Sequence, residues 1–188
     1  MKSILLFPGA FNPPHLGHAK SVELALQARI FDEVWIMPSG KRVDKAIETT
    51  YEDRREMGKI FTAYVESLID VPVRLITTEL DEKDGRYTSE LLKEIKSQPG
   101  AMVTQLIGLD GYLNLRPRED EHFIIIKRPG YELPSDFSLK SDCSLLEEVG
   151  EDISSTHIRN LIKVKDASYR QFVPPAIVDY IDKKQLYR

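Results

Sequence analysis

The sequence predicts an α/β fold with a mostly parallel sheet of five or six strands and helices on both faces. Three observations support this fold class. Short apolar runs alternate along the chain with longer amphipathic stretches, which is the order of βαβ units. The runs are continuously apolar, as expected for strands covered on both faces. Turn residues such as Pro8-Gly9 and Pro38-Ser39-Gly40 follow the runs and end them.

Each expected strand is a short apolar run bounded by turn residues. The first, at residues 3–7, is the best candidate for a central strand because it is apolar throughout and a glycine-, proline- and histidine-rich segment follows it directly. The others lie at residues 34–37, 73–76, 102–107, 123–126 and, more weakly, 145–149.

The expected helices follow from apolar residues spaced by three and four. Ala19, Val22, Leu26 and Ile30 share one helical face, so a core-facing helix is predicted to reach Ile30. A cleaner stripe runs from Met57 to Leu68. Shorter helices are predicted around residues 91–95, at 156–164 and at 175–184.

Length and composition indicate one domain over residues 1–188, with a small helical part from about residue 154. The chain has 188 residues, of which 41% are apolar, and a chain of this size buries roughly 70% of its extended surface. Twenty-six Lys and Arg against 30 Asp and Glu give a net charge of −4. This balance argues against a protein that coats nucleic acid or an anionic membrane. A single cysteine, Cys143, and no export or membrane segment favour the cytoplasm.

The first candidate site is the segment from Gly9 to His18, which directly follows the first strand. Ligands of open α/β sheets bind at the carboxyl ends of strands, where a helix N-terminus offers free N–H groups and partial positive charge. Glycines allow close backbone approach, and Pro13 and Pro14 stiffen the loop that presents His15 and His18. Two imidazoles there can hydrogen bond to phosphate and stabilise charge at phosphorus.

Two other interpretations of this segment remain open. The histidines could be incidental to a structural turn. They could also be zinc ligands, for which His122, His157 and Cys143 are the available partners, although none is paired with them at a ligand spacing.

A second candidate anion site is the segment 153–159, which reads Ile-Ser-Ser-Thr-His-Ile-Arg. Ser and Thr are preferred helix N-caps, and Arg159 lies one turn from Ser155 and Thr156 on the same side. A phosphate here could meet hydroxyl, backbone N–H and guanidinium groups together. The alternative is an ordinary capped helix with a solvated arginine.

Arg54 and Arg55 lie in the first turn of the second amphipathic helix, where cations are unfavourable unless they are paired or face an anion. Arg54 shares a face with Met57 and is expected to point toward the strand ends. Arg55 is expected to be solvated beside Glu52 or Asp53, and pairing of both arginines with acidic neighbours is the alternative.

These motifs resemble the nicotinate (nicotinamide) mononucleotide adenylyltransferase family. Residues 9–18 fit its G-x-F-x-P-x-H-x-G-H motif, residues 153–159 fit its I-S-S-T-x-I-R motif, and Tyr87-Thr88 fits its pyridine-binding segment. The resemblance extends from Lys2 to Tyr187. It implies a Rossmann-like fold and a reaction of ATP with a pyridine mononucleotide that gives the dinucleotide and pyrophosphate. It also implies Mg²⁺ bound mainly through substrate phosphates, with no protein metal ligands; a homo-oligomer is possible.

The resemblance assigns the site residues in three groups. The catalytic group is His15, His18, Lys45 and Arg159. The ATP-binding group is Gly9, Phe11, Gly17, Gly108, Asp110, Ser154, Ser155, Thr156 and Arg159. The group that binds the mononucleotide is Ala10, Asn12, Ser39, Lys45, Arg54, Tyr87, Thr88 and Tyr112. Lys41 and Arg42 are looser candidates, while Asp110 and Thr88 could instead be helix caps.

One departure from the family concerns the pyridine ring. The family carries a tryptophan or similar aromatic residue after the Gly-x-Asp, whereas residues 109–121 contain only Tyr112. Tyr112 is therefore the candidate to stack on the ring. The alternatives for function are another small-molecule nucleotidyltransferase, such as a pantetheine-phosphate adenylyltransferase, and a nucleotide-binding module without turnover.

Overall fold

The computed structural model describes residues 2–40, 47–81, 100–115, 121–135, 139, 142–149 and 152–188. Its centre is a six-stranded sheet in which neighbouring strands are parallel. In chain order the strands are β1 (Lys2–Gly9), β2 (Glu33–Pro38), β3 (Val73–Leu75), β4 (Ala101–Gly108), β5 (His122–Lys127) and β6 (Cys143–Val149). The predicted parallel sheet is confirmed, including its weakest strand.

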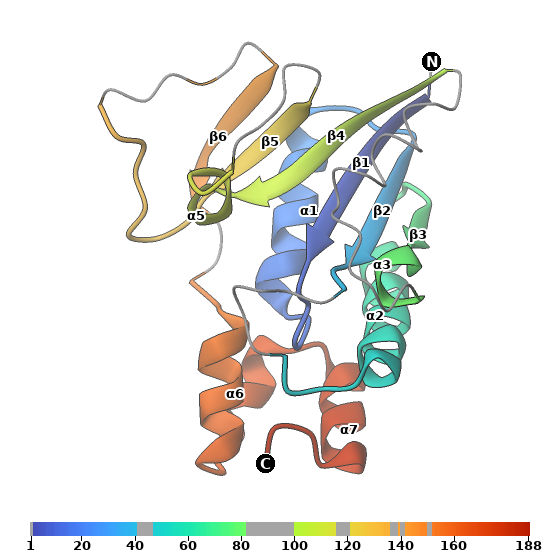
Figure 1. The fold of residues 1–188 in the computed structure, drawn as a ribbon, viewed down its shortest axis with the longest axis vertical. Helices are drawn as coiled ribbons and strands as arrows, with labels where there is room; N and C mark the ends of the chain where they lie inside the picture. The colour runs from blue at the N-terminus through green and yellow to red at the C-terminus, as the bar shows by residue number, and fades with distance from the viewer. Residues whose placement is uncertain are drawn as a thin grey trace.

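Strand β1 lies inside the sheet, where the direction of strand addition reverses. The order across the sheet is β3-β2-β1-β4-β5-β6, so the chain adds β2 and β3 on one side of β1 and then β4, β5 and β6 on the other (Figure 1). In open parallel sheets, ligands bind beside the carboxyl ends of the strands at such a switch point. The ends of β1 and β4 therefore mark the expected ligand site.

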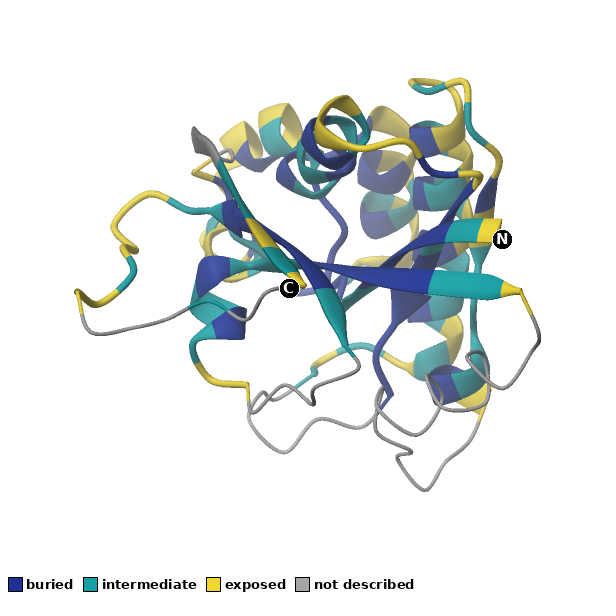
Figure 2. Cartoon of the chain, turned by 90° about the horizontal axis from the view of Figure 1, so that it is seen from above, coloured by how far each residue is buried: buried dark blue, intermediate teal, exposed yellow. Residues whose placement is uncertain are grey.

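The two long helices, α1 (Leu16–Ala28) and α2 (Tyr51–Glu66), cover one face of the sheet. Seen from above, the helices gather on one side of the strands, with buried surfaces turned inward (Figure 2). One apolar cluster joins Leu5 and Ile36 of the strands to Val22 of α1 and Phe61 of α2. On the opposite face, the one-turn helix α5 (Leu109–Tyr112) packs on β5. Helices on both faces are thus confirmed; the helix predicted near residues 91–95 lies outside the described residues.

The C-terminal helices lie beyond the carboxyl ends of β1 and β2 (Figure 1). They are α6 (Ser155–Lys163), the 3₁₀-helix η1 (Ala167–Phe172) and α7 (Pro175–Lys184). Their buried residues Ile158 and Ile177, and Tyr187 after α7, belong to the same apolar cluster as Leu5 of β1. The helical part is therefore built onto the core of the sheet. No helix within the described residues is long and apolar enough to span a bilayer.

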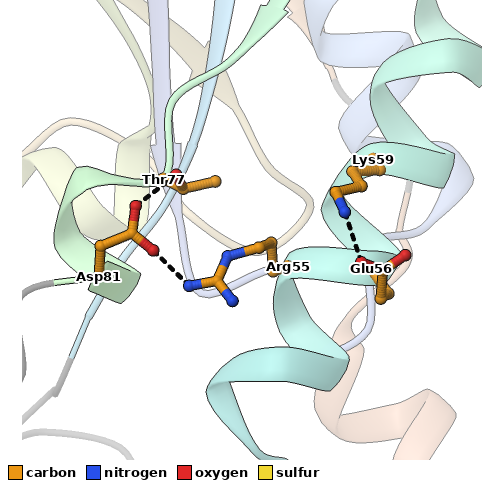
Figure 3. A network of polar contacts seen from close by, with 5 residues as sticks. All are labelled: Arg55, Glu56, Lys59, Thr77 and Asp81. Atoms are coloured by element: carbon orange, nitrogen blue, oxygen red, sulfur yellow. Dashed lines mark hydrogen bonds and ion pairs between the residues drawn. The ribbon is translucent and has the colours of Figure 1, made fainter.

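Two sequence predictions about the helices are wrong. Helix α1 ends at Ala28, and Ile30, predicted to face the core, is 88% exposed. Arg55 is not placed beside Glu52 or Asp53; it bonds to Asp81 at the end of the short helix α3 (Thr78–Asp81), and the Thr77 hydroxyl donates to the same carboxylate at 2.7 Å (Figure 3). This network ties α2 to α3, whereas the neighbouring Lys59–Glu56 pair stays within α2.

Candidate active site

The two motif histidines form a stacked pair where β1 passes into α1. His15 is the N-cap of α1 and His18 lies in its first turn, with ring centroids 3.6 Å apart and planes inclined by 23°. The backbone N–H of His15 donates to Nδ1 of His18 at 3.1 Å. In the neutral His18 ring this leaves the proton on Nε2, which makes Nε2 the donor.

Burial sets the charge of the pair. His15 is only 4% exposed, and burial, followed by the charges of His18 and Arg128, holds its pKa well below the ordinary value of 6.5. His15 is therefore neutral at pH 7 in the unliganded protein. A neutral imidazole can still donate an N–H to a phosphate oxygen, so the ring can serve as a hydrogen-bond donor without carrying a charge.

An aromatic cage surrounds the His18 ring. The rings of Phe11, Phe7 and Phe61 lie edge-on at centroid distances of 4.9, 5.8 and 6.2 Å. The Phe11 backbone has φ of 44°, a region that a bulky residue seldom adopts. Its ring leaves so little room that a Cβ on Gly9 would lie 3.1 Å from it. Gly9 and Phe11 therefore shape the loop through backbone and packing, since the Phe11 side chain is buried.

The carbonyl groups of the β1–α1 loop are held from outside by donors of other elements. Arg54 is 1% exposed and donates to the carbonyl oxygen of Ala10 at 2.9 Å and to that of Ser39. Arg54 thus points to the strand ends as predicted, but its guanidinium lies among backbone carbonyls. The Ser39 N–H donates to the carbonyl of Gly9 at 2.8 Å, which joins the ends of β1 and β2.

The start of α6 lies directly against this loop. Ser155 Oγ donates to the carbonyl of Pro13 at 2.9 Å, and Arg159 Nη1 donates to the carbonyl of Asn12 at 2.8 Å. Arg159 Nη2 also reaches Thr156 Oγ1 at 3.3 Å, so the one-turn spacing places them on the same side as predicted. Ser154 is the N-cap, with its Oγ accepting from the N–H of His157 at 3.1 Å. Two motifs about 140 residues apart in sequence therefore form one site.

A third side of the site is formed by the ends of β4 and β5. A Cβ on Gly108 would lie 2.6 Å from Asp110 Oδ1 and 3.2 Å from Arg128 Cδ, so a side chain there would displace the Asp110 carboxylate. Arg128 Nη2 donates to the carbonyl of Ile153 at 3.0 Å, and its Nη1 lies 3.8 Å from Asp110 Oδ2. The N-cap of α5 is Gly108, so the alternative of Asp110 as a helix cap is wrong.

Arg128 lies in this candidate site and is not among the residues predicted from the sequence. It follows β5 directly, at the same edge of the sheet as Gly9 and Gly108, and it links the Gly-x-Asp turn to the segment that enters α6. The available signal was an arginine immediately after an apolar strand, followed by Pro129-Gly130. That signal is weak because many strands end in a charged residue.

The prediction that Tyr112 stacks on a substrate ring is not supported by its position. Its side chain is 1% exposed, packs edge-on against Phe123 at 5.4 Å, and has its hydroxyl 3.2 Å from Cys143 Sγ. The apolar α5–β5 contact accounts for this position, because Tyr112 fills the face of the sheet that α5 covers. Lys45, Tyr87, Thr88, Lys41 and Arg42 lie outside the described residues.

The metal-binding alternative finds no supporting cluster. Within the part of the chain that the structure describes, no three His, Cys, Asp or Glu side chains come together to hold an ion. His122 is the first residue of β5, so it lies at the amino ends of the strands, away from His15 and His18. The His157 ring packs against Phe172, with ring centroids 5.7 Å apart. The described donors around His15 and His18 are nitrogen and hydroxyl groups suited to phosphate.

The fold and the known family models agree on a class. The family model described as cytidylyltransferase-like matches residues 6–161. The structure of Plasmodium falciparum nicotinic acid mononucleotide adenylyltransferase complexed with NaAD superimposes with a TM-score of 0.82 and 22% identity, covering 100% of this chain and 98% of that chain. The chain therefore belongs to the cytidylyltransferase-like family and is a nucleotidyltransferase.

Comparison with individual relatives identifies the family within this class. A probable nicotinate-nucleotide adenylyltransferase of Lactiplantibacillus plantarum is 35% identical over 191 residues, which cover 95% of this chain and 85% of that protein. The nicotinate-nucleotide adenylyltransferase of Bacillus subtilis is 29% identical, with 100% of this chain and 99% of that protein covered. The chain belongs to the nicotinate-nucleotide adenylyltransferase family.

Proposed function

We propose that this protein transfers the adenylyl group of ATP to nicotinate mononucleotide or nicotinamide mononucleotide, giving deamido-NAD or NAD and releasing pyrophosphate. The observation that carries the proposal is the direct contact between the histidine loop and the Ser-Ser-Thr corner, through Ser155–Pro13 and Arg159–Asn12. A triphosphate needs donors along its whole length, and these two corners supply them side by side.

The reaction is an in-line displacement at the α-phosphorus of ATP. An oxygen of the mononucleotide 5′-phosphate forms the new bond, and the bond from the α-phosphorus to the β-phosphate oxygen breaks. The nucleophile is ionised near neutrality, since the second pKa of a phosphate monoester is about 6, so no general base is required. Catalysis then rests on position and charge, with His15 and His18 donating to the α-phosphate and Lys45 as a further cation expected from the family resemblance.

The outgoing pyrophosphate lies at the start of α6 in this proposal. The first N–H groups of a helix have no intrahelical acceptor and point outward, together with the positive end of the helix dipole. Arg159 carries five donors, of which the bonds to Asn12 and Thr156 use two. Ser154, Ser155 and Thr156 complete the corner. Arg54, buried among carbonyls, contributes by holding the loop in shape.

The remaining residues are assigned either to the adenosine of ATP or to the pyridine mononucleotide. Gly108 and Asp110 lie at the end of β4, where a carboxylate can accept from ribose hydroxyls. Arg128 lies against Gly108 and adds a cation and a flat guanidinium to the adenosine side. Ala10, Asn12 and Ser39 line the mononucleotide side, with Tyr87 and Thr88 as the expected contacts of the pyridine substituent.

We also propose that Mg²⁺ enters with the nucleotide. The described residues offer no cluster of carboxylates for a protein-held ion, and Mg²⁺ commonly binds through substrate phosphates and water. When bound, it would neutralise charge on the phosphates of ATP. We place the reaction in the cytoplasm, where ATP is supplied and where the free Cys143 would stay reduced.

The test is a pyrophosphate-release assay with ATP, Mg²⁺ and a panel of acceptors. Nicotinate mononucleotide, nicotinamide mononucleotide and pantetheine phosphate are supplied separately, and the dinucleotide product is identified by mass. We expect turnover with a pyridine mononucleotide. Turnover with pantetheine phosphate alone would assign the chain to another nucleotidyltransferase, and binding of ATP with no pyrophosphate from any acceptor would overturn the enzymatic proposal.

A further inference from the structure

The end of the chain reaches into the loop that presents the histidines. The Tyr187 hydroxyl donates to Asn12 Oδ1 at 2.7 Å, across 175 residues of sequence. Tyr187 is 6% exposed, and the C-terminus lies between α6 and α7 on the side to which β1 points (Figure 1). We propose that Tyr187 is a positioning residue for adenylyl transfer, acting through Asn12. This inference rests on the proposed function.

Asn12 is the point where the loop is held most fully. Its Oδ1 accepts from Tyr187 and from Thr49 Oγ1, both at 2.7 Å, and its carbonyl accepts from Arg159 at 2.8 Å. The residue is 2% exposed. Pro13 and Pro14 follow it and have no N–H to donate, so side-chain anchors must hold this stretch. Three residues later in the chain lies His15, whose ring stacks on His18.

The tail that carries Tyr187 is itself fixed. Helix α7 ends at the left-handed Gln185, the Leu186 N–H donates to the Ile181 carbonyl at 3.1 Å, and Arg188 bonds to Asp182 at 2.8 Å. Burial raises the pKa of Tyr187, so the hydroxyl stays protonated and serves as the donor. The tail therefore holds the Tyr187 hydroxyl in place against the loop.

Removing this hydroxyl should affect reaction geometry more than folding. In Tyr187→Phe the ring keeps its packing, and Asn12 Oδ1 keeps the Thr49 bond, so no buried acceptor is orphaned. The loop loses one anchor, and a misplacement near 1 Å can cost on the order of a hundredfold in rate. We expect kcat to fall about tenfold with the KM for ATP changed less than about threefold.

The matched control is Tyr169→Phe. Tyr169 is also buried, in the same apolar cluster, and its hydroxyl donates to Asp182 at 2.8 Å, away from the loop. Asp182 retains Arg170 and Arg188 in this variant. Each variant loses one tyrosine hydroxyl hydrogen bond, to an amide oxygen in Tyr187→Phe and to a carboxylate in Tyr169→Phe. Similar melting temperatures with a kcat decrease confined to Tyr187→Phe would support the inference. Equal kcat for Tyr187→Phe and wild type would overturn it.

A second measurement separates this inference from the proposed function. The side-chain amide signals of ¹⁵N-labelled Asn12 should shift in Tyr187→Phe and stay unchanged in Tyr169→Phe, whether or not the protein turns over. An inactive wild type with this pattern would refute the proposed function alone and leave Tyr187 as the anchor of Asn12. Identical Asn12 signals in both variants would refute the anchor. Thr49→Val combined with Tyr187→Phe should lower kcat by a factor different from the product of the single effects, because both hydroxyls act on one oxygen.

Discussion

At the residue scale, the two stacked imidazoles that the proposed function places at the α-phosphate differ in burial. His15 is buried and neutral, whereas His18 is half-buried and in its neutral form has its proton on Nε2. Two rings 3.6 Å apart disfavour double protonation, since each charge would repel the other. Negative charge that builds on the α-phosphate in the transition state favours protons on both rings. Under the proposed function, the pair would therefore respond to the transition state more than to bound ATP.

His18→Ala should lower turnover by about a hundredfold or more while changing the KM for ATP by less than about threefold, as expected for a donor used mainly in the transition state. His122→Ala is the matched control, because His122 lies at the opposite edge of the sheet. Steady-state kinetics with saturating acceptor measure both parameters. A rise in the KM for ATP with kcat unchanged would show uniform binding instead.

The buried His15 predicts a pH dependence of stability. Its folded-state pKa lies below 6.5, so under mildly acidic conditions the unfolded chain takes up a proton that the folded protein does not. Stability should therefore fall as the pH drops from about 7.5 to 5, by up to about 1.4 kcal/mol for each pH unit below 6.5. Urea unfolding of His15→Gln should show a flatter profile over this window. An NMR titration of the His15 ring in the wild type with a midpoint at or above 6.5 would contradict the argument.

The sequence predicted those candidate site residues that lie together within a short motif. Gly9 to His18 and Ser154 to Arg159 each combine several informative residue types within ten positions, and the structure brings the two motifs together. Arg128 and Tyr187 were missed as site residues because their partners, Ile153 and Asn12, are distant in sequence. Tyr112 was misjudged because an aromatic residue after a strand fits a core as well as a ring-binding site.

At the element scale, the residues at the start of α6 both cap the helix and hold the β1–α1 loop. Ser154 caps the helix, while the side chains of Ser155 and Arg159 donate hydrogen bonds to carbonyls of the β1–α1 loop. The helix therefore supports the histidine loop, and under the proposed function the N–H groups of Ser155 and Thr156, which precede the capped N–H of His157, serve the anion. A capped helix and a phosphate site were alternatives from the sequence, but the structure shows that the cap and the loop contacts coexist.

Ser154→Asp separates the two purposes. Asp is as good an N-cap as Ser and complements the helix dipole, so the melting temperature should be retained or slightly raised. A carboxylate at the triphosphate corner should raise the KM for ATP about tenfold, and added salt should reduce this penalty. Ser154→Gly is the uncharged control, costing only a few tenths of a kcal/mol. An unchanged KM for ATP in Ser154→Asp would show that the triphosphate does not bind at the start of α6.

Helix and strand positions followed from periodicity better than helix ends did. The strands lie where apolar runs predicted them, and α7 has the predicted bounds. The stripe through Ala19, Val22 and Leu26 extends in sequence to Ile30, but the chain leaves the helix at Ala28 to enter β2, so Ile30 faces solvent. Arg55 pairs with Asp81, which a rule for residues three or four apart could not identify because Asp81 lies in α3.

At the scale of the whole molecule, one core positions both halves of the site. The sheet supplies the strand ends, and the C-terminal part supplies Ser155 and Arg159 from α6 and Tyr187 from the tail after α7. Leu5 of the sheet and Ile177 of α7 nevertheless belong to one apolar cluster. The parallel order of the sheet could be predicted from its βα alternation. The docking of α6 and α7 across the strand ends could not, because it depends on contacts between the two ends of the chain.

The shared core predicts that the sheet and the C-terminal helices unfold together. Leu5 and Ile177 are both 0% exposed, so Leu5→Ala and Ile177→Ala should each cost about 2–5 kcal/mol and lower the melting temperature by roughly 4–20 °C. Ile30→Ala is the control, since an 88% exposed side chain should contribute within about 0.5 kcal/mol. Trp35 in β2 reports on the sheet by fluorescence, while circular dichroism reports on the helices. In Ile177→Ala both signals should shift by the same amount in one transition, because a cavity under α7 weakens the core on which β1 and β2 also depend. A helical transition that moves while the Trp35 transition stays in place would show two independently folding units.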